Sequence, residues 1–205
     1  MGYKNVISLD EAGCGSLAGP VVAGAVSLDS RKFVSKFADI RGVRDSKKLS
    51  AKKREQLYKI LTKHPLIKWG IGVVSEKIID KINIKNAAEL AMEKALNKLK
   101  SKCRNSNARI DYLIIDGNRL KNLKLKNYSF KLIVKADAKV LSCAMASILA
   151  KVTRDKIMAE YHKKYPKYGF NKHKGYPTKK HLLRLRKYGP CKIHRKSFLP
   201  VSLAK

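Results

Sequence analysis

Acidic residues are scarce in this sequence, which has 15 Asp and Glu against 47 Lys and Arg in 205 residues and a formal net charge of +32. So much like charge opposes a compact fold unless the chain binds a polyanion, and the composition therefore favours nucleic acid as a partner. Lys outnumbers Arg 36 to 11, which is also what a general bias toward lysine produces. Part of the charge can therefore be compositional background.

Membrane and disulfide signals are missing too. We find no long apolar span, no signal peptide and no basic amphipathic helix with a lipid anchor, so we expect no membrane association and a cytoplasmic location. The four cysteines are far apart and form no C-x-x-C motif, at Cys14, Cys103, Cys143 and Cys191. This spacing indicates reduced thiols and argues against a structural zinc site.

The chain also lacks repeats, low-complexity segments and an interdomain linker, while 44% hydrophobic residues are enough for one substantial core. We therefore expect a single domain over residues 1–205 that acts as a monomer. Residues from about 165 to 205 form its basic, aromatic tail, which we expect to bind substrate.

The apolar runs predict strands followed by strands that alternate with helices. Strands are expected at about 3–10, 21–28 (antiparallel to the first), 66–74, 112–116 and 130–134, and a polar loop at 104–108. Helices are expected at about 51–62 with Ser50 as the N-cap, at 84–99, at 139–161 and after Thr178. The small side chains of 142–150 allow close approach to a sheet. This order predicts an α/β fold with a mixed sheet covered by helices.

Three of the strand-like runs end in a carboxylate, namely 6–11 with Asp10 and Glu11, 112–116 with Asp116, and 132–137 with Asp137. Strand ends of α/β sheets gather ligands at the sheet edge. Carboxylates brought together repel one another unless a cation lies among them. Hard divalent cations take oxygen ligands, and two such ions can drive phosphodiester hydrolysis. The pattern therefore predicts a Mg²⁺ or Mn²⁺ site for chemistry on nucleic acid.

Adjacent Asp10 and Glu11 point to opposite faces of a regular strand, so both serve one site only if the strand ends there and the chain turns. Gly13 and Gly15 make that turn easy. Alternatively, Asp116 belongs to a simple turn and Asp137 caps a helix, both common positions for Asp.

Motifs run in order from residue 6 to residue 200. They are Asp10-Glu-Ala-Gly-x-Gly-x-Leu-Ala-Gly-Pro20, Arg44-Asp-Ser-Lys-Lys-Leu49, Leu113-Ile-Ile-Asp-Gly-Asn118, Lys135-Ala-Asp-Ala-Lys139, Ala146-Ser-Ile-Leu-Ala-Lys-Val-Thr-Arg-Asp155, Tyr168-Gly-Phe-x-x-His-Lys-Gly-Tyr-Pro-Thr178 and Lys187-Tyr-Gly-Pro-x-x-x-His-Arg-Lys-Ser-Phe198. Together they resemble the bacterial form of the ribonuclease HII family over nearly the whole chain.

The resemblance implies an RNase H-like mixed β-sheet flanked by helices, with a C-terminal helical and loop-rich segment. It implies a divalent-metal endonuclease that cuts RNA in RNA–DNA hybrids and incises 5′ of single ribonucleotides embedded in duplex DNA, leaving a 3′ hydroxyl. The family's four metal-binding carboxylates match Asp10, Glu11, Asp116 and Asp137. The loop that reads the 2′ hydroxyl matches Gly13, Cys14 and Gly15, and a sugar-packing tyrosine matches Tyr176.

One departure from the family concerns Cys14, because the family's turn is usually Gly-Arg-Gly-Pro. Backbone groups can still reach the 2′ hydroxyl, but a guanidinium contact is lost. Ser46 and Lys47 lie in a loop near the expected active edge, as phosphate contacts or as solvated side chains. Asp155, in mid-helix, is expected to pair with Arg154 or Lys151.

The tail carries further candidates. Its histidines lack the i, i+4 spacing of a helical zinc pair, and phosphate contact or surface placement is expected for His173, His181 and His194. Aromatic residues interleaved with lysines suit stacking on nucleic acid, at Tyr165, Tyr168 and Tyr176, whereas Phe170 is expected in the core.

Two rival functions stay open. A non-enzymatic basic RNA-binding protein, such as a ribosome-associated factor, would share the charge but would not need carboxylates at three strand ends. An enzyme of the ribonuclease HIII type would carry an extra N-terminal domain, whereas this chain reaches its first strand within a few residues of Met1.

Overall fold

The computed structural model describes residues 5–28, 43, 49–102, 110, 112–121 and 125–204. Ser46, Lys47 and the polar loop expected at 104–108 lie outside the described residues.

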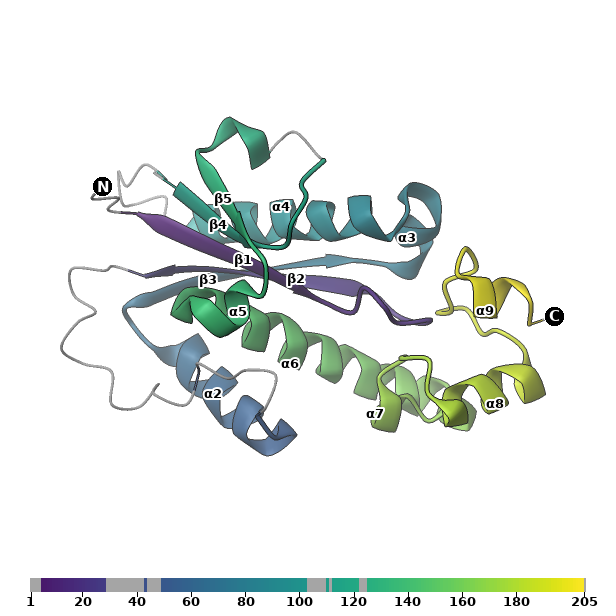
Figure 1. Cartoon of the computed structure of the whole chain (residues 1–205). Coiled ribbons are helices and arrows are strands. Elements are labelled where there is room, and N and C mark those ends of the chain that lie inside the picture. The colour runs from purple at the N-terminus through teal and green to yellow at the C-terminus, as the bar shows by residue number, and fades with distance from the viewer. Residues whose placement is uncertain are drawn as a thin grey trace.

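Within this part of the chain, five strands form one mixed sheet in the order β3-β2-β1-β4-β5 (Figure 1). The strands are β1 (Val6–Ala12), β2 (Val21–Leu28), β3 (Ile67–Val74), β4 (Tyr112–Asp116) and β5 (Phe130–Ile133). β2 is antiparallel to both β1 and β3, whereas β4 is parallel to both β1 and β5. The predicted mixed sheet and the antiparallel pairing of its first two strands are confirmed.

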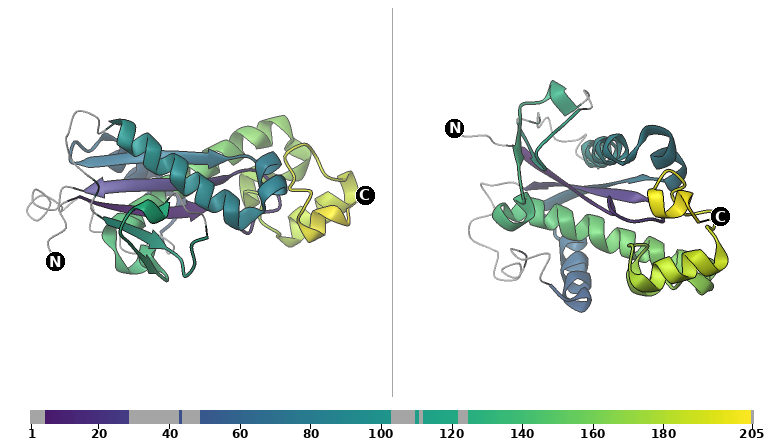
Figure 2. Two further views of the ribbon diagram at one scale, coloured as in Figure 1. Left: turned by 90° about the horizontal axis from the view of Figure 1, so that it is seen from above. Right: turned by 45° about the vertical axis from the view of Figure 1, so that its right-hand side comes forward.

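Helices cover both faces of the sheet (Figure 2). One face carries α3 (Glu76–Ile82) and α4 (Ile84–Lys102), whose apolar side chains join those of β1 and β2 in one core cluster. The other face carries α2 (Ala51–Lys63) and α6 (Leu141–Lys164), with a second cluster between them and the sheet. The predicted cap of α2 is confirmed, because the Ser50 side chain accepts a hydrogen bond from Lys53 N.

Glycines let the long helices lie close to the strands. A Cβ on Gly24 of β2 would stand 2.4 Å from the Ala146 carbonyl oxygen of α6, and one on Gly72 of β3 would stand 1.9 Å from the Ala91 carbonyl oxygen of α4. Both distances are too short for any side chain. The small residues expected to face the sheet, such as Ala144 and Ala146, are fully buried. Helix α6 therefore passes directly over β1 and β2, where it reaches the candidate site.

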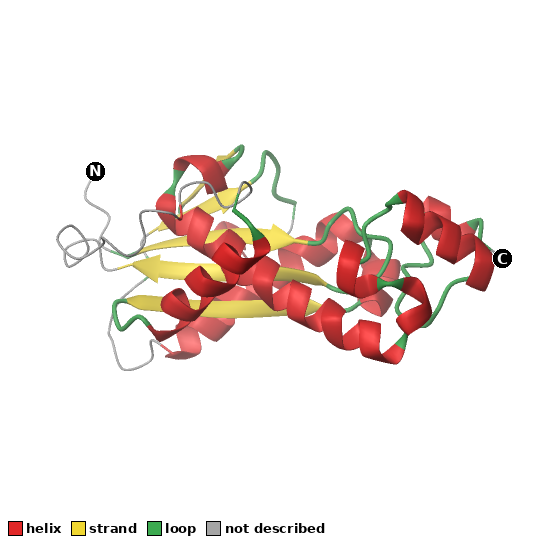
Figure 3. Ribbon diagram, turned by 90° about the horizontal axis from the view of Figure 1, so that it is seen from below, coloured by secondary structure: helices red, strands yellow, loops and turns green. Residues whose placement is uncertain are grey.

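The tail forms α7 (Phe170–His173), α8 (Lys179–Tyr188) and α9 (Leu199–Ser202), gathered at one end of the molecule (Figure 3). The helix predicted after Thr178 is confirmed, and the Thr178 side chain caps it by accepting from His181 N. The tail is tied to the body by Asp80 of α3, which accepts hydrogen bonds from the backbone of Lys196 and Ser197 at 3.0 and 2.9 Å.

Three boundaries near the site differ from the sequence expectation. β1 does not end at Asp10 but runs through Glu11 to Ala12. β5 ends at Ile133, and Asp137 lies in the first turn of α5 (Ala136–Lys139) instead of at a strand end. The change of direction comes at Lys135, which adopts a left-handed conformation with φ 56°. The long helix α6 starts at Leu141 instead of Lys139 because the extended Val140 separates it from α5.

Candidate active site

Asp10 and Asp116 lie on adjacent parallel strands. The β1–β4 register pairs Leu9 with Ile115, so the next step places Asp10 level with Asp116. Asp10 is 4% exposed and faces α6, where it has a hydrogen bond with Ser147. The backbone N–H of Glu11 also donates to Asp10 Oδ1, at 2.7 Å. The two strand ends thus bring two carboxylates together, as the sequence predicted.

Asp137 reaches the same region through α5. Asp116 Oδ1 accepts a hydrogen bond from the backbone N–H of Ala136 at 2.8 Å, which fixes the start of α5 against the end of β4. Asp137, the next residue, is 2% exposed. The alternative of a helix cap is wrong for Asp137, because Lys135 holds the N-cap position and Asp137 lies inside the first turn.

The electrostatics show that these acids share one environment. Burial first, and then the charges of Glu11 and Asp116, hold the pKa of Asp10 well above its usual value. The thiol of Cys143 on α6 has its pKa raised to about 12, chiefly by burial, with smaller contributions from Asp10, Asp116 and Asp137. Like charges are therefore concentrated here in a low-dielectric site, which is what a bound cation relieves.

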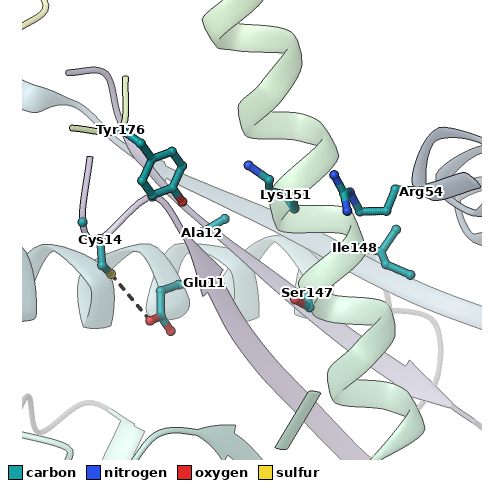
Figure 4. Close-up of a pocket in the computed structure, with 10 residues that line it drawn as sticks. Glu11, Ala12, Cys14, Arg54, Ser147, Ile148, Lys151 and Tyr176 are labelled. Atoms are coloured by element: carbon teal, nitrogen blue, oxygen red, sulfur yellow. Dashed lines mark hydrogen bonds between the residues drawn. The ribbon is translucent and has the colours of Figure 1, made fainter. Parts of the chain in front are cut away.

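Glu11 is turned toward the neighbouring turn. β1 continues through Glu11 to Ala12, so the expected strand end at Asp10 is not found, yet the charge of Glu11 is the second cause that raises the pKa of Asp10. Its Oε1 accepts a weak hydrogen bond from Cys14 Sγ at 3.5 Å (Figure 4). Burial, followed by the charge of Glu11, raises the pKa of the Cys14 thiol, so Cys14 is a neutral donor here.

The donor set fits a hard divalent cation, since it consists of carboxylate oxygens around a buried, electrostatically strained Asp10. As the side chains stand, no three His, Cys, Asp or Glu residues in the described part of the chain converge closely enough to hold a metal ion. No three of the four carboxylates therefore meet at one point in the described residues. That they bind metal stays a prediction.

A cleft of about 480 Å³ opens beside Glu11. One side is formed by the turn Gly13–Gly15 and by Tyr176, and the other by Ser147 and Lys151 of α6 with Arg54 of α2 (Figure 4). The structure thus brings Gly13, Cys14, Gly15 and Tyr176 together, as predicted for substrate contacts. The cleft has Glu11 on one side and Arg54 and Lys151 on the other, and these two cations are suited to contact a phosphate backbone.

Sequence reasoning missed three of the polar residues that line the cleft, namely Arg54, Ser147 and Lys151. Their positions on α2 and α6 gave no composition signal, although Ser147 and Lys151 fall on one helix face at i, i+4 spacing. The predicted pairing of Asp155 is confirmed with Lys151, whose Nζ lies 2.9 Å from Asp155 Oδ1.

Two buried arginines support the turn and were also missed as site residues. Arg195 donates to the carbonyl oxygens of Gly13 at 2.8 Å and Cys14 at 3.0 Å, and Arg154 donates to those of Pro20 at 2.9 Å and Lys174 at 3.0 Å. Burial, and then the neighbouring charge of Arg154, lowers the pKa of Arg195 to about 10.

Arg154 leaves no room for a side chain at Gly13 of the turn. Gly13 has φ 98°, and a Cβ there would lie 2.0 Å from Arg154 Nε. Arg154 shares the buried stripe of α6 with Ala150 and Met158, a spacing from which its burial was predictable.

The expectations for the tail are partly wrong. His181 and His194 are 0% and 1% exposed, so neither lies on the surface or contacts phosphate. Tyr168 is buried and stacks on Phe170, with ring centroids 5.4 Å apart, and is not available to nucleic acid. The core position of Phe170 is confirmed. Tyr176 lines the cleft, with Lys151 Nζ 5.3 Å from its ring centroid.

Comparison with known proteins gives consistent relatives. A model of the ribonuclease HII family matches residues 7–201. The chain is 47% identical to ribonuclease HII of Caldicellulosiruptor bescii over 97% of this chain and 88% of that protein. It is 45% identical to ribonuclease HII of Francisella philomiragia over 97% of this chain and 98% of that protein. No helix in the described residues is long and apolar enough to cross a membrane.

Solved structures agree on the fold. The crystal structure of ribonuclease H2 from Pyrococcus horikoshii has a TM-score of 0.72 and 28% identity, covering 97% of this chain and 95% of that one. Bst-RNase HIII, solved in complex with Mn²⁺, has a TM-score of 0.71 at 20% identity over 99% of this chain and 70% of that one, a likeness of fold alone. Family match, relatives and RNase H-like fold all agree: the chain belongs to the ribonuclease HII family and is a ribonuclease H.

Proposed function

We propose that this ribonuclease H acts as a monomer and incises on the 5′ side of single ribonucleotides in duplex DNA, as well as cutting longer hybrids. The reaction uses two divalent ions, Mg²⁺ or Mn²⁺. The residues that hold these ions are Asp10, Glu11, Asp116 and Asp137. The observation that carries this proposal is the register of β1 and β4, which brings Asp10 level with Asp116. The turn and the cationic side of the cleft adjoin these strand ends. The Mn²⁺ bound to its fold neighbour Bst-RNase HIII supports the choice of ion.

The ions, when bound, activate a water and neutralise charge on the phosphoryl oxygens. Asp10, Glu11, Asp116 and Asp137 would hold them, and the raised pKa of Asp10 supports this assignment, because a bound cation would offset the repulsion among the neighbouring acids. Lys151 and Arg54 face the cleft and attract the backbone phosphates.

Recognition of the ribose falls to the turn and to Tyr176. Arg195 donates hydrogen bonds to the carbonyl oxygens of Gly13 and Cys14 and so orients the backbone of the turn. In this orientation the backbone N–H groups of Gly13–Gly15 contact the 2′ hydroxyl. Tyr176, whose ring centroid is 5.3 Å from Lys151 Nζ and 5.4 Å from Arg154 Cζ, packs on the adjoining sugar.

The test is cleavage of a duplex that contains one ribonucleotide, with Mg²⁺ or Mn²⁺, and mapping of both product ends. An all-DNA duplex and a continuous RNA–DNA hybrid of the same sequence serve as references. We expect one cut on the 5′ side of the ribonucleotide, with a 3′ hydroxyl and a 5′ phosphate, and no cut in the all-DNA duplex. Cleavage of the hybrid alone would overturn the single-ribonucleotide part of the proposal.

A further inference from the structure

Two histidines in the interior of the tail have no part in the chemistry proposed above. His181 lies on α8, and His194 lies in the segment that follows it, where it pairs with Ala18 in an isolated bridge. Their Nε2 atoms are 3.1 Å apart, and both side chains are fully buried. Buried imidazoles in contact satisfy each other only if one donates and the other accepts.

The partners on either side fix the direction of this hydrogen bond. His194 Nδ1 accepts from the backbone N–H of Cys191 at 2.9 Å, so its proton is on Nε2, which donates to His181 Nε2. His181 therefore carries its proton on Nδ1, which donates to the carbonyl oxygen of Tyr176 at 2.9 Å. The chain of hydrogen bonds thus ends on the backbone of the residue that forms one side of the cleft.

The turn, which lies on the same side of the cleft as Tyr176, is contacted by the next residue along the chain. Arg195 follows His194 directly, and its guanidinium donates to the carbonyl oxygens of Gly13 and Cys14. The backbone N–H of Arg195 also donates to Leu17 at 2.8 Å. One dipeptide, His194-Arg195, therefore contacts the turn directly and Tyr176 through His181.

We infer that His181 and His194 are positioning residues that hold Tyr176 at a set distance from the Gly13–Gly15 turn, and so fix the spacing of the two groups that contact a single ribose and its neighbouring sugar in a duplex. This inference rests on the proposed function, in which the turn and Tyr176 contact the ribonucleotide and its neighbouring sugar. A ribonucleotide flanked by DNA offers only one 2′ hydroxyl, so its recognition depends on this distance more than recognition of a continuous hybrid does.

The neutral state that the hydrogen-bond chain requires holds near neutral pH. Burial is the main cause that lowers the pKa of His181 and of His194 to about 4, and nearby His173 adds to the shift in both. Arg184 acts in the same direction on His181. His173 stacks on His181 with ring centroids 4.3 Å apart, and its Nε2 meets the Tyr168 carbonyl oxygen.

Two substitutions of His181 separate its two hydrogen bonds. Asn places its amide near the position of Nδ1, so His181→Asn keeps the bond to Tyr176 and loses the bond to His194. Gln reaches the position of Nε2, so His181→Gln keeps His194 and loses Tyr176. We expect kcat/KM on the single-ribonucleotide duplex to fall about fivefold to tenfold in His181→Gln, as loss of one hydrogen bond predicts. His181→Asn should fall less, and both should change little on continuous hybrid.

A double-mutant cycle with Tyr176→Ala separates positioning from general destabilisation. If His181 acts through Tyr176, His181→Gln changes kcat/KM less than about twofold once Tyr176 is removed. His64→Gln, at the C-cap of α2 and not among the residues that line the cleft, is the matched histidine control and should match wild type. Equal losses with and without Tyr176 would overturn the inference and leave His181 a structural residue.

The tautomers give a readout on the unmodified protein. Long-range ¹⁵N–¹H spectra at neutral pH should show His181 protonated at Nδ1 and His194 at Nε2. The opposite tautomers, or a charged imidazolium, would refute the chain of hydrogen bonds whatever the substrate is. If wild type cuts only continuous hybrid, the proposed function fails in its finer part, whereas the tautomers still decide whether the chain exists.

Discussion

Asp116 accepts a hydrogen bond from the backbone N–H of Ala136, at 2.8 Å, and this contact ties the end of β4 to the helix that carries Asp137. The Asp116 carboxylate is thus bonded to the backbone of the residue that precedes Asp137, although the two acids are far apart in the sequence. Asn at position 116 offers a carbonyl oxygen in the same place, so the contact survives the loss of charge. Charge and architecture at this site can therefore be tested separately.

Asp10→Asn should stabilise the metal-free protein at neutral pH. The pKa of Asp10 is raised in the folded state, so protonated Asp10 contributes to the stability of the fold. This contribution to the free energy of unfolding is fully present below the ordinary pKa of 3.8 and is lost as the pH rises through the folded-state pKa. Asn stays neutral at every pH, so the variant does not lose this stability. The wild-type loss in the free energy of unfolding is about 1.4 kcal/mol for every tenfold by which folding increases the affinity of the Asp10 carboxylate for a proton.

Urea unfolding in EDTA at several pH values measures this difference. The variant and wild type should have the same free energy of unfolding below pH 3.8, and the variant should gain steadily above it. Adding Mn²⁺ should stabilise wild type more than the variant. A difference that does not depend on pH would show that Asp10 is not strained by burial and charge.

Arg195→Lys should destabilise the protein and loosen the turn. Lysine cannot place donors on the carbonyl oxygens of Gly13, Cys14 and Gly19 at once, as the guanidinium does. We expect a loss of roughly 1–3 kcal/mol in the free energy of unfolding, from carbonyl groups left without donors. Lys196→Arg, an exposed neighbour, is the control and should be neutral. Unchanged stability in Arg195→Lys would show that the turn holds its shape unaided.

Cys14→Arg should raise kcat/KM on the single-ribonucleotide duplex. Cys14 lines the cleft as a neutral thiol, and a guanidinium there would add a charged hydrogen bond to a backbone phosphate. Such a bond is worth roughly 1.5–3 kcal/mol, or about tenfold or more in rate. The gain should be smaller on continuous hybrid, and Cys14→Ser should match wild type. No gain on either substrate would mean that the turn does not contact phosphate from this position.

Affinity for duplex should depend steeply on salt. Each neutralised phosphate contributes about −0.9 to the slope of log K against log salt, so roughly four to eight contacts give about −4 to −7. Lys151→Gln should make the slope shallower by about one contact, because Lys151 lines the cleft. Lys163→Gln, exposed and paired with Glu160, is the control. A slope near zero would make the high net charge compositional background.

Local signals in the sequence predicted much of the fold. The helix after Ser50 and the strand 21–28 were placed within a residue of their observed ends, because a cap and an apolar run act within a few neighbours. The prediction that Asp137 lies at a strand end was wrong, because Lys135 adopts a left-handed conformation and changes the direction of the chain. A lysine in the sequence does not indicate that conformation. The helix Glu76–Ile82 was missed altogether.

The support of the site was the least predictable part. Asp10, Glu11 and Asp116 lie on strands that the apolar runs predicted, but the burial of Arg195 depends on carbonyl oxygens near the start of the chain. The contact between His181 and His194 likewise needs the fold of the tail before the two rings can meet. Spacing in the sequence reports periodic local structure, and these partners are neither periodic nor local.

Hydrolysis by Asp116→Asn tests the central claim most directly. Single-turnover cleavage of the single-ribonucleotide duplex should be measured with Mg²⁺ and with Mn²⁺ for wild type, Asp116→Asn and Glu160→Gln, an exposed acid of α6. We expect Asp116→Asn to fold and bind duplex normally and to lose cleavage by several orders of magnitude, since bound ions supply most of the charge stabilisation. Glu160→Gln should cleave like wild type. Near-normal cleavage by Asp116→Asn with either ion would contradict the assignment of these strand-end carboxylates to a metal site.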